Sequence, residues 1–201
     1  IEKPATIDPS LLKNIKETAE NNSQRAYCVL QVRLNPVVQK IKYYLDNNLL
    51  GKIRGISLVQ RWQRPKEYFD DWRGEPKIGG GILHECGIHY LDILCYLVGA
   101  PRVCYTKLYN TKHLNIDIED TVYSVVDFGN FGGTIEVTIS SEPRNIECSL
   151  SFLTDKGFFE IGGKALNKIE KFNFLDVSLE STDTQEHRIP NSYKTYQGSC
   201  P

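Results

Sequence analysis

The sequence predicts an α+β fold, in which helices cover one face of a large and mostly antiparallel sheet. Apolar residues recur at helical spacing in the first hundred residues. From residue 102 onward the pattern changes to short strands separated by tight turns, and strands joined in this way pair antiparallel. The chain has 201 residues, of which 40% are hydrophobic, so it is long enough to bury a sizeable core.

The first half of the chain alternates helical and extended patterns. Asp8-Pro9 and Asn35-Pro36 are each typical of a helix start, because a capping side chain precedes proline at the first helical position. The predicted elements are a helix from 8 to 22, a strand over 26–34, a helix from 36 to about 48, a strand over 52–63 and a polar, aromatic loop over 64–80.

The second half predicts an antiparallel meander. Residues 129–133 and 155–157 have the composition of hairpin turns. The predicted strands are 103–109, 121–128, 134–140, 147–154, 157–161, 168–174 and 177–180. Residues 181–201 are polar and weakly patterned, so we expect a loosely held tail.

Composition restricts the class of protein. The formal net charge is -1, which favours neither nucleic acid nor an anionic membrane as a partner. No apolar run approaches the roughly 20 residues of a membrane span, and no secretory signal is present, so we expect a cytoplasmic protein. Six widely spaced cysteines are interpreted as reduced thiols rather than a disulfide framework. The chain contains no Met, even at position 1, and we expect it to be a piece of a longer protein.

One long helix carries the chemically informative residues. It follows three glycines, Gly79 to Gly81, and ends at Gly99-Ala100-Pro101. Its polar side chains form one stripe at spacings of four, three and four, namely Glu85, His89, Asp92 and Tyr96. A buried histidine beside carboxylates suits general acid–base chemistry, since its ordinary pKa is about 6.5. A core histidine satisfied by Asp92 or Glu85 is an equally good interpretation of the stripe alone.

Other motifs are weaker. His84 and His89 are five residues apart and do not share a helix face, so no metal site is predicted. The three glycines lack nucleotide-binding spacing, and they suit either a flexible approach to the helix or a close-lying ligand. Lys3 alone is typical of a surface lysine. Cationic and aromatic side chains lie close together in the sequence at Arg61, Trp62, Arg64, Trp72 and Arg73. This mixture suits an anionic or sugar ligand, or equally a surface loop.

Taken together, these motifs resemble the glucose–fructose oxidoreductase / inositol dehydrogenase family (Gfo/Idh/MocA). The matching segments, in order, are Glu2-Lys3-Pro4, Arg33-Leu34-Asn35-Pro36, Leu50-Gly51-Lys52-Ile53, Trp72-Arg73-Gly74, the glycine-led helix and Ile118-Glu119-Asp120-Thr121. The resemblance implies a dehydrogenase that uses NAD or NADP. Residues 1–35 would be the end of a Rossmann cofactor domain, and residues 36–201 a substrate-binding and oligomerisation domain truncated at its end. The cofactor's phosphate cradle would be missing, so the chain alone is expected to be inactive.

The resemblance also implies roles for individual residues. Lys3 and His89 would be catalytic, with Lys3 acting on the reacting hydroxyl and His89 as general acid/base. Lys3 and Pro4 would contact the cofactor. Asp92 would bind substrate or orient His89, and Glu85 stands where the family commonly has Asp. The expected substrate-binding residues are Glu85, Asp92, Arg33, Trp72 and Arg73.

Within the family, the segments 31–36 and 80–89 look most like the nucleotide-sugar branch. That branch oxidises the 3-hydroxyl of UDP-N-acetylglucosaminuronate in surface-polysaccharide synthesis. The alternative hypothesis is a non-catalytic ligand-sensing or interaction protein of the same fold. Because helices are expected on one sheet face only, the other face should be flat and partly apolar, and it predicts a homo-oligomer.

Overall fold

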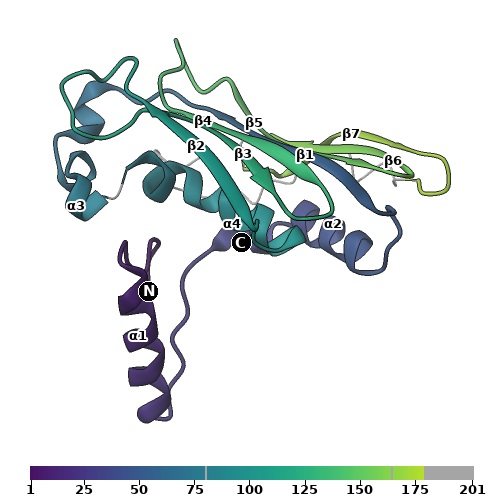
Figure 1. Ribbon diagram of the computed structural model, residues 1–201, viewed down its shortest axis with the longest axis horizontal. Coiled ribbons are helices and arrows are strands. Elements are labelled where there is room, and N and C mark those ends of the chain that lie inside the picture. The colour runs from purple at the N-terminus through teal and green to yellow at the C-terminus, as the bar shows by residue number, and fades with distance from the viewer. Residues whose placement is uncertain (80, 164, 179–201) are drawn as a thin grey trace.

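The computed structural model describes residues 1–79, 81–163 and 165–178. Within them, helices cover one face of a seven-stranded sheet, and the helix α1 stands away from it (Figure 1). The elements are α1 Pro9–Asn21, η1 Gln31–Leu34, α2 Pro36–Asp46, β1 Ile53–Arg61, η2 Lys66–Phe69, η3 Trp72–Gly74, α3 Pro76–Gly79, η4 Leu83–Gly87, α4 Ile88–Val98, β2 Val103–Tyr109, β3 Thr121–Asp127, β4 Gly132–Thr138, β5 Glu147–Thr154, β6 Gly157–Gly162 and β7 Lys168–Phe174. The α+β class and the mostly antiparallel sheet are confirmed.

The strand order is β2-β3-β4-β1-β5-β6-β7, and only β1 and β4 pair in parallel. The prediction of one continuous meander is therefore wrong at its centre, because β1 lies between β4 and β5. Side chains of β1 alternate, and Ile56, Leu58 and Gln60 are buried against the helices. A nine-residue strand with this pattern gains most from the central place, where both of its edges are hydrogen-bonded.

One predicted strand is wrong, and a second is not formed in the part of it that the structure describes. Residues 23–30 form no strand, and the 3₁₀-helix η1 follows them. Strand-forming residues are present there, but among the described residues this segment makes long-range backbone bonds only with Ile1: Val29 N donates to Ile1 O at 2.9 Å and Ile1 N donates to Tyr27 O at 2.8 Å. Without a neighbouring strand, propensity alone does not make one. Residues 177 and 178 are not in a strand either, whereas 179–180 and the expected tail lie outside the described residues.

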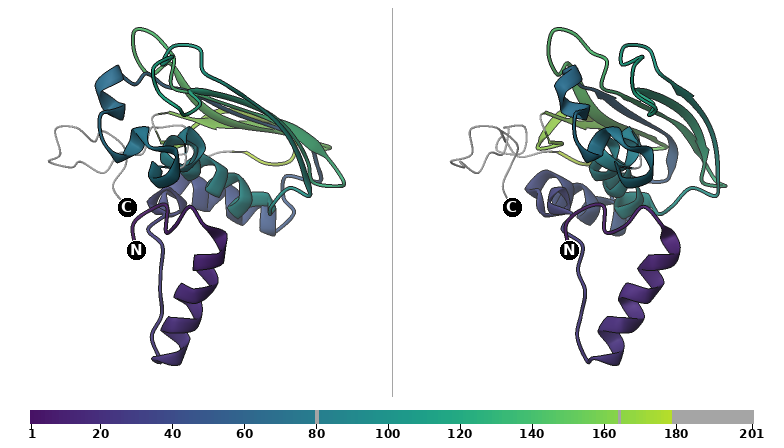
Figure 2. Two further views of the ribbon diagram at one scale, coloured as in Figure 1. Left: turned by 60° about the vertical axis from the view of Figure 1, so that its left-hand side comes forward. Right: turned by 90° about the vertical axis from the view of Figure 1, so that its left-hand side faces the viewer.

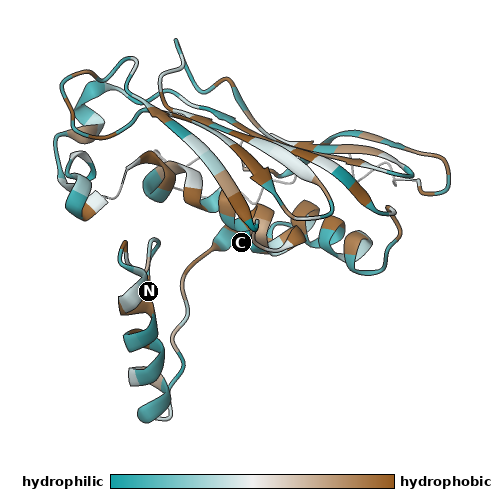
Figure 3. Ribbon diagram, viewed as in Figure 1, coloured by the Kyte–Doolittle hydropathy of each residue, from teal (hydrophilic) through white to brown (hydrophobic). Residues whose placement is uncertain are grey.

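The core lies between the sheet and the helices α2 and α4. Ile41 of α2 and Ile93 of α4 are fully buried, as are Leu58 and Phe152 of the sheet. Figure 3 shows that apolar residues concentrate in the sheet and in α4, whereas α1 is mainly hydrophilic. Helix α1 has no buried residue and projects from the helix layer on the side away from the sheet (Figure 2). The long arm that contains it returns to the core at α2.

The other face of the sheet is open. It exposes apolar side chains on the edge strand β2 and its neighbour β3, including Val103, Tyr105, Tyr123 and Val125. Further along this face, Arg61 contacts Glu136 and Glu147 across three strands. No helix in the described ranges has the length and apolar character needed to cross a membrane.

Candidate active site

The glycine-led helix begins with an unusual backbone. Gly81 has a φ of 85°, and a Cβ atom there would lie 2.3 Å from Glu119 Oε1. The same carboxylate oxygen accepts a hydrogen bond from Ile82 N at 3.1 Å. The next residues, Leu83 to Gly87, form a π-helical turn before α4 begins. Such turns are frequent at functional sites, and this one carries Glu85.

Glu85 gathers contacts from segments far apart in the sequence. Lys3 Nζ donates to Glu85 O at 2.7 Å and lies 3.5 Å from Glu85 Oε2. Tyr68 Oη donates to Glu85 Oε1 at 2.7 Å, and burial raises the pKa of Tyr68 well above its usual value. Arg73 Nε lies 3.7 Å from the same oxygen. Glu85 is thus a charged centre that joins the N-terminal arm to the loop before the helix.

His89 lies one turn further along the same helix. Burial, together with the nearby Lys3 ammonium, lowers the pKa of His89 to about 4, although Asp92 and Glu85 oppose the shift. Its Nδ1 atom is buried and has no hydrogen-bond partner among the residues that the structure describes. The imidazole is therefore neutral at pH 7, and it can accept a proton.

Asp92 contacts the arm rather than His89. Arg33 Nε and Nη2 donate to the two Asp92 oxygens at 2.7 and 2.5 Å, and this contact raises the pKa of Arg33. The Arg33 guanidinium also lies 5.1 Å from the centre of the Tyr96 ring. The polar stripe therefore faces the N-terminal arm, with Lys3 at Glu85 and Arg33 at Asp92.

The expected site residues do not all meet. An open pocket of about 1220 Å³ is lined by Lys3, Glu85 and His89. Pro4, Arg33, Trp72, Arg73 and Asp92 do not line it. Trp72 is 41% exposed and packs against Arg73 instead, with 5.2 Å between the guanidinium and the ring centre. Sequence reasoning did not single out Tyr68, which lines the pocket and contacts Glu85. The aromatic character of its loop was the only signal in the sequence.

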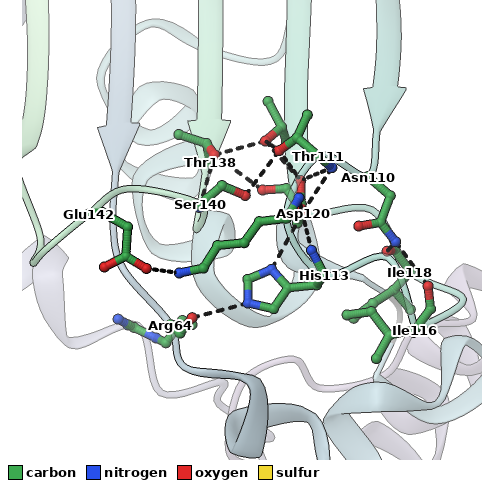
Figure 4. Close-up of polar contacts among 12 residues, drawn as sticks. Arg64, Asn110, Thr111, His113, Ile116, Ile118, Asp120, Thr138, Ser140 and Glu142 are labelled. Atoms are coloured by element: carbon green, nitrogen blue, oxygen red, sulfur yellow. Dashed lines mark hydrogen bonds and ion pairs between the residues drawn. The ribbon is translucent and has the colours of Figure 1, made fainter.

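A buried hydrogen-bond network around Asp120 holds the start of the loop over residues 64–80. Asp120 accepts hydrogen bonds from the backbone N–H groups of Thr111, Lys112 and His113. Burial alone would raise the pKa of Asp120, but these bonds together hold it well below its usual value. His113 Nε2 lies 3.0 Å from Arg64 O, to which it must donate, since a carbonyl oxygen only accepts (Figure 4). The network therefore fixes the backbone where the loop begins.

No group of three His, Cys, Asp or Glu within residues 1–79, 81–163 and 165–178 is arranged to hold a metal ion. The five cysteines of these ranges are free, and Cys200 lies outside them.

Comparisons with known proteins agree with this fold. Residues 38–160 match the GFO/IDH/MocA C-terminal domain. An oxidoreductase of Formosa agariphila is 26% identical over 49% of this chain, and an uncharacterized oxidoreductase of Schizosaccharomyces pombe is 22% identical over 73%. The matched parts are only 32% and 40% of those two proteins.

Solved structures extend the comparison. The WlbA dehydrogenase from Bordetella pertussis, in complex with NADH and UDP-GlcNAcA, has a TM-score of 0.83 and 29% identity. The match covers 92% of this chain and 54% of that protein. The corresponding complex of the WlbA dehydrogenase from Chromobacterium violaceum has a TM-score of 0.83 and 28% identity. That match covers 90% of this chain and 53% of the other protein. A levoglucosan dehydrogenase complex with NADH shares the fold, with a TM-score of 0.73 at 18% identity, covering 84% of this chain and 48% of that one.

Proposed function

The chain belongs to the GFO/IDH/MocA C-terminal domain family of oxidoreductases, and from this we propose that it is the substrate-binding part of an NAD(P)-dependent sugar dehydrogenase. The reaction is oxidation of a ring hydroxyl. The observation that supports it best is one pocket that holds Lys3, Glu85 and a partly buried, neutral His89. Residues 1–35 are proposed as the end of a cofactor domain, and residues 36–201 as the substrate and oligomerisation domain.

The chemistry follows from the protonation states. Oxidising an alcohol requires a base for the hydroxyl proton while hydride leaves the carbon. His89 is neutral at pH 7 and accepts this proton. Lys3 carries a positive charge beside the pocket and stabilises the developing alkoxide. Glu85 holds Lys3 in place through its backbone carbonyl and its carboxylate.

A nicotinamide cofactor, NAD or NADP, would supply the hydride acceptor. Lys3 fits one edge of its site, because its ammonium reaches the pocket that His89 lines. Pro4, which follows Lys3, is proposed to contact the cofactor. The sequence contains no GxGxxG phosphate-binding motif, so we propose that residues 1–201 alone do not catalyse the reaction.

The proposed substrate is a nucleotide sugar of the UDP-N-acetylglucosaminuronate type, oxidised at its 3-hydroxyl in cytoplasmic polysaccharide synthesis. The support is the likeness to the two WlbA dehydrogenases, which extends over at least 90% of this chain. Among the expected substrate-binding residues, Glu85 lines the pocket. Arg33, Asp92, Trp72 and Arg73 are proposed to act from its border.

The test uses the full-length protein that contains this sequence. Reduced nicotinamide is monitored by absorbance with a panel of sugars and nucleotide sugars. His89→Ala should lower kcat by roughly a hundredfold or more, because the proton acceptor is lost. His84→Ala is the matched control, since His84 lies on the same helix start but does not line the pocket. An active protein that is unaffected by His89→Ala would contradict the catalytic assignment.

The alternative function is ligand sensing without catalysis. The presence of Lys3, His89 and Asp92 argues against it, whereas Glu85 in place of the family's common Asp leaves it open. A full-length protein that binds the cofactor and sugars but turns over none of them would support this alternative.

We also propose that the chain forms a homo-oligomer through the open sheet face. Four exposed apolar side chains on β2 and β3 support this, since such patches mark interaction surfaces. The Arg61, Glu136 and Glu147 cluster on the same face would fix the relative orientation of two copies.

A further inference from the structure

Arg64 lines the pocket, but in the described part of the chain it has no acidic partner. No carboxylate oxygen within residues 1–79, 81–163 and 165–178 lies within 4.0 Å of its guanidinium. Neighbouring cations differ, because Lys3 contacts Glu85, Arg61 contacts Glu136 and Arg73 contacts Asp71. Arg64 is therefore a cation in the pocket whose charge is not neutralised by a neighbouring carboxylate.

The Arg64 side chain is nevertheless held in one orientation. Its guanidinium lies 4.7 Å from the Trp62 ring centre and 5.3 Å from that of Tyr68. Its Nη1 atom donates to Gln63 O at 2.8 Å and lies 3.4 Å from Asn145 Oδ1. The backbone is fixed as well, since Arg64 N donates to Ile139 O and His113 holds Arg64 O. Figure 4 shows the side chain extending away from His113. Little side-chain freedom remains to be lost on binding a ligand.

One edge of the guanidinium stays available. Both hydrogen bonds use Nη1, and within the described part of the chain Nε and Nη2 have no partner. Neither atom is among the buried polar atoms that lack a partner, so both are accessible. The edge formed by Nε and Nη2 matches the two oxygens of a carboxylate or phosphate group. Arg144, which is exposed and lines the same pocket, likewise has no carboxylate within 4.0 Å in the described ranges.

We propose that Arg64, assisted by Arg144, forms a subsite for an anionic group of the sugar substrate. This rests on the proposed function and adds a residue that selects the substrate. The subsite is connected to the reacting residues, because Tyr68 stacks on Arg64 and donates to Glu85, which contacts Lys3. The anionic group therefore belongs to the molecule whose hydroxyl meets Lys3 and His89. A sugar carboxylate and a diphosphate share this chemistry, and the experiment separates them.

Binding is measured by isothermal titration calorimetry with three probes, in the absence of cofactor. N-acetylglucosaminuronic acid carries only the carboxylate, UDP-N-acetylglucosamine only the diphosphate, and N-acetylglucosamine neither. Arg64→Gln should weaken binding of one anionic probe at least about tenfold, as expected when a charge-assisted hydrogen bond is lost. The probe that is affected identifies the source of the anionic group. Binding of N-acetylglucosamine should stay unchanged.

Arg54→Gln is the matched control. Arg54 lies on β1, the strand that precedes Arg64, contacts Asp155 at 3.7 Å and does not line the pocket. Thermal unfolding followed by circular dichroism checks each variant. If Arg64→Gln does not fold, Arg64→Lys and Arg144→Gln replace it, and each should weaken the same anionic probe.

Two results would overturn the proposal. One is equal weakening of the neutral and anionic probes by Arg64→Gln, and the other is wild-type protein that binds neither anionic probe. The binding measurement does not depend on hydride transfer. A preserved anion preference in a full-length protein without dehydrogenase activity would leave the subsite standing and remove the proposed function.

Discussion

The pH dependence of stability is the most direct test of the His89 environment. In the folded chain the pKa of His89 is about 4, whereas an unfolded histidine has its ordinary value of about 6.5. Below pH 6.5 the unfolded chain takes up a proton at this position, and the folded chain does not. The stability that His89 contributes is thus fully present above pH 6.5 and is lost as the pH falls toward 4. The difference in pKa corresponds to at most about 3 kcal/mol.

Urea unfolding of wild type and His89→Gln, at pH values between 7 and 4, measures this contribution. The glutamine variant cannot titrate at position 89, so its free energy of unfolding should fall less steeply between pH 6.5 and 4. Subtracting the two curves removes the titration of all other groups. Identical curves for the two proteins, or an NMR titration that places the pKa of His89 near 6.5, would refute the reasoning.

Two further predictions concern the helix start and the open sheet face. In urea unfolding, Gly81→Ala should destabilise the chain by more than Gly99→Ala. Both glycines have a positive φ, but only at Gly81 does an added Cβ meet Glu119. Equal decreases in the free energy of unfolding for the two variants would contradict this. Val125→Arg should convert an oligomer to monomer in sedimentation experiments, since it places a charge beside Tyr105 in the exposed apolar patch; a wild-type monomer at high concentration would count against the interface.

Periodicity and capping residues were enough to predict most of the fold. Asp8 and Asn35 cap α1 and α2 as expected, since each side chain accepts a hydrogen bond from the backbone two residues on. Strand order was not predictable in this way. Alternation along β1 identifies its buried face, but it does not identify the neighbours of its edges. For residues 26–34 the sequence predicted a strand that does not form, because strand propensity was present without a partner strand.

The site was partly predictable for similar reasons. Helical spacing placed Glu85 and His89 on one face, and the structure puts both in the pocket. The same spacing indicated that something faces the polar stripe of Glu85, His89, Asp92 and Tyr96. It did not indicate that this partner is the N-terminal arm. The contacts of Lys3 with Glu85 and of Arg33 with Asp92 join residues 82 and 59 positions apart. Local patterns do not report contacts over such distances.

The central position of β1 has a consequence for the order of folding. Strands β2 to β4 and β5 to β7 are each consecutive in the chain and adjacent in the sheet, so they can pair soon after they are synthesised. Strand β1 pairs with β5, whose residues lie about ninety positions later, so it must wait until most of the domain has left the ribosome. Until then the edge of β1 that pairs with β5 has no partner strand. We therefore expect insertion of β1 between the two preformed halves to be the slow, aggregation-sensitive step of folding.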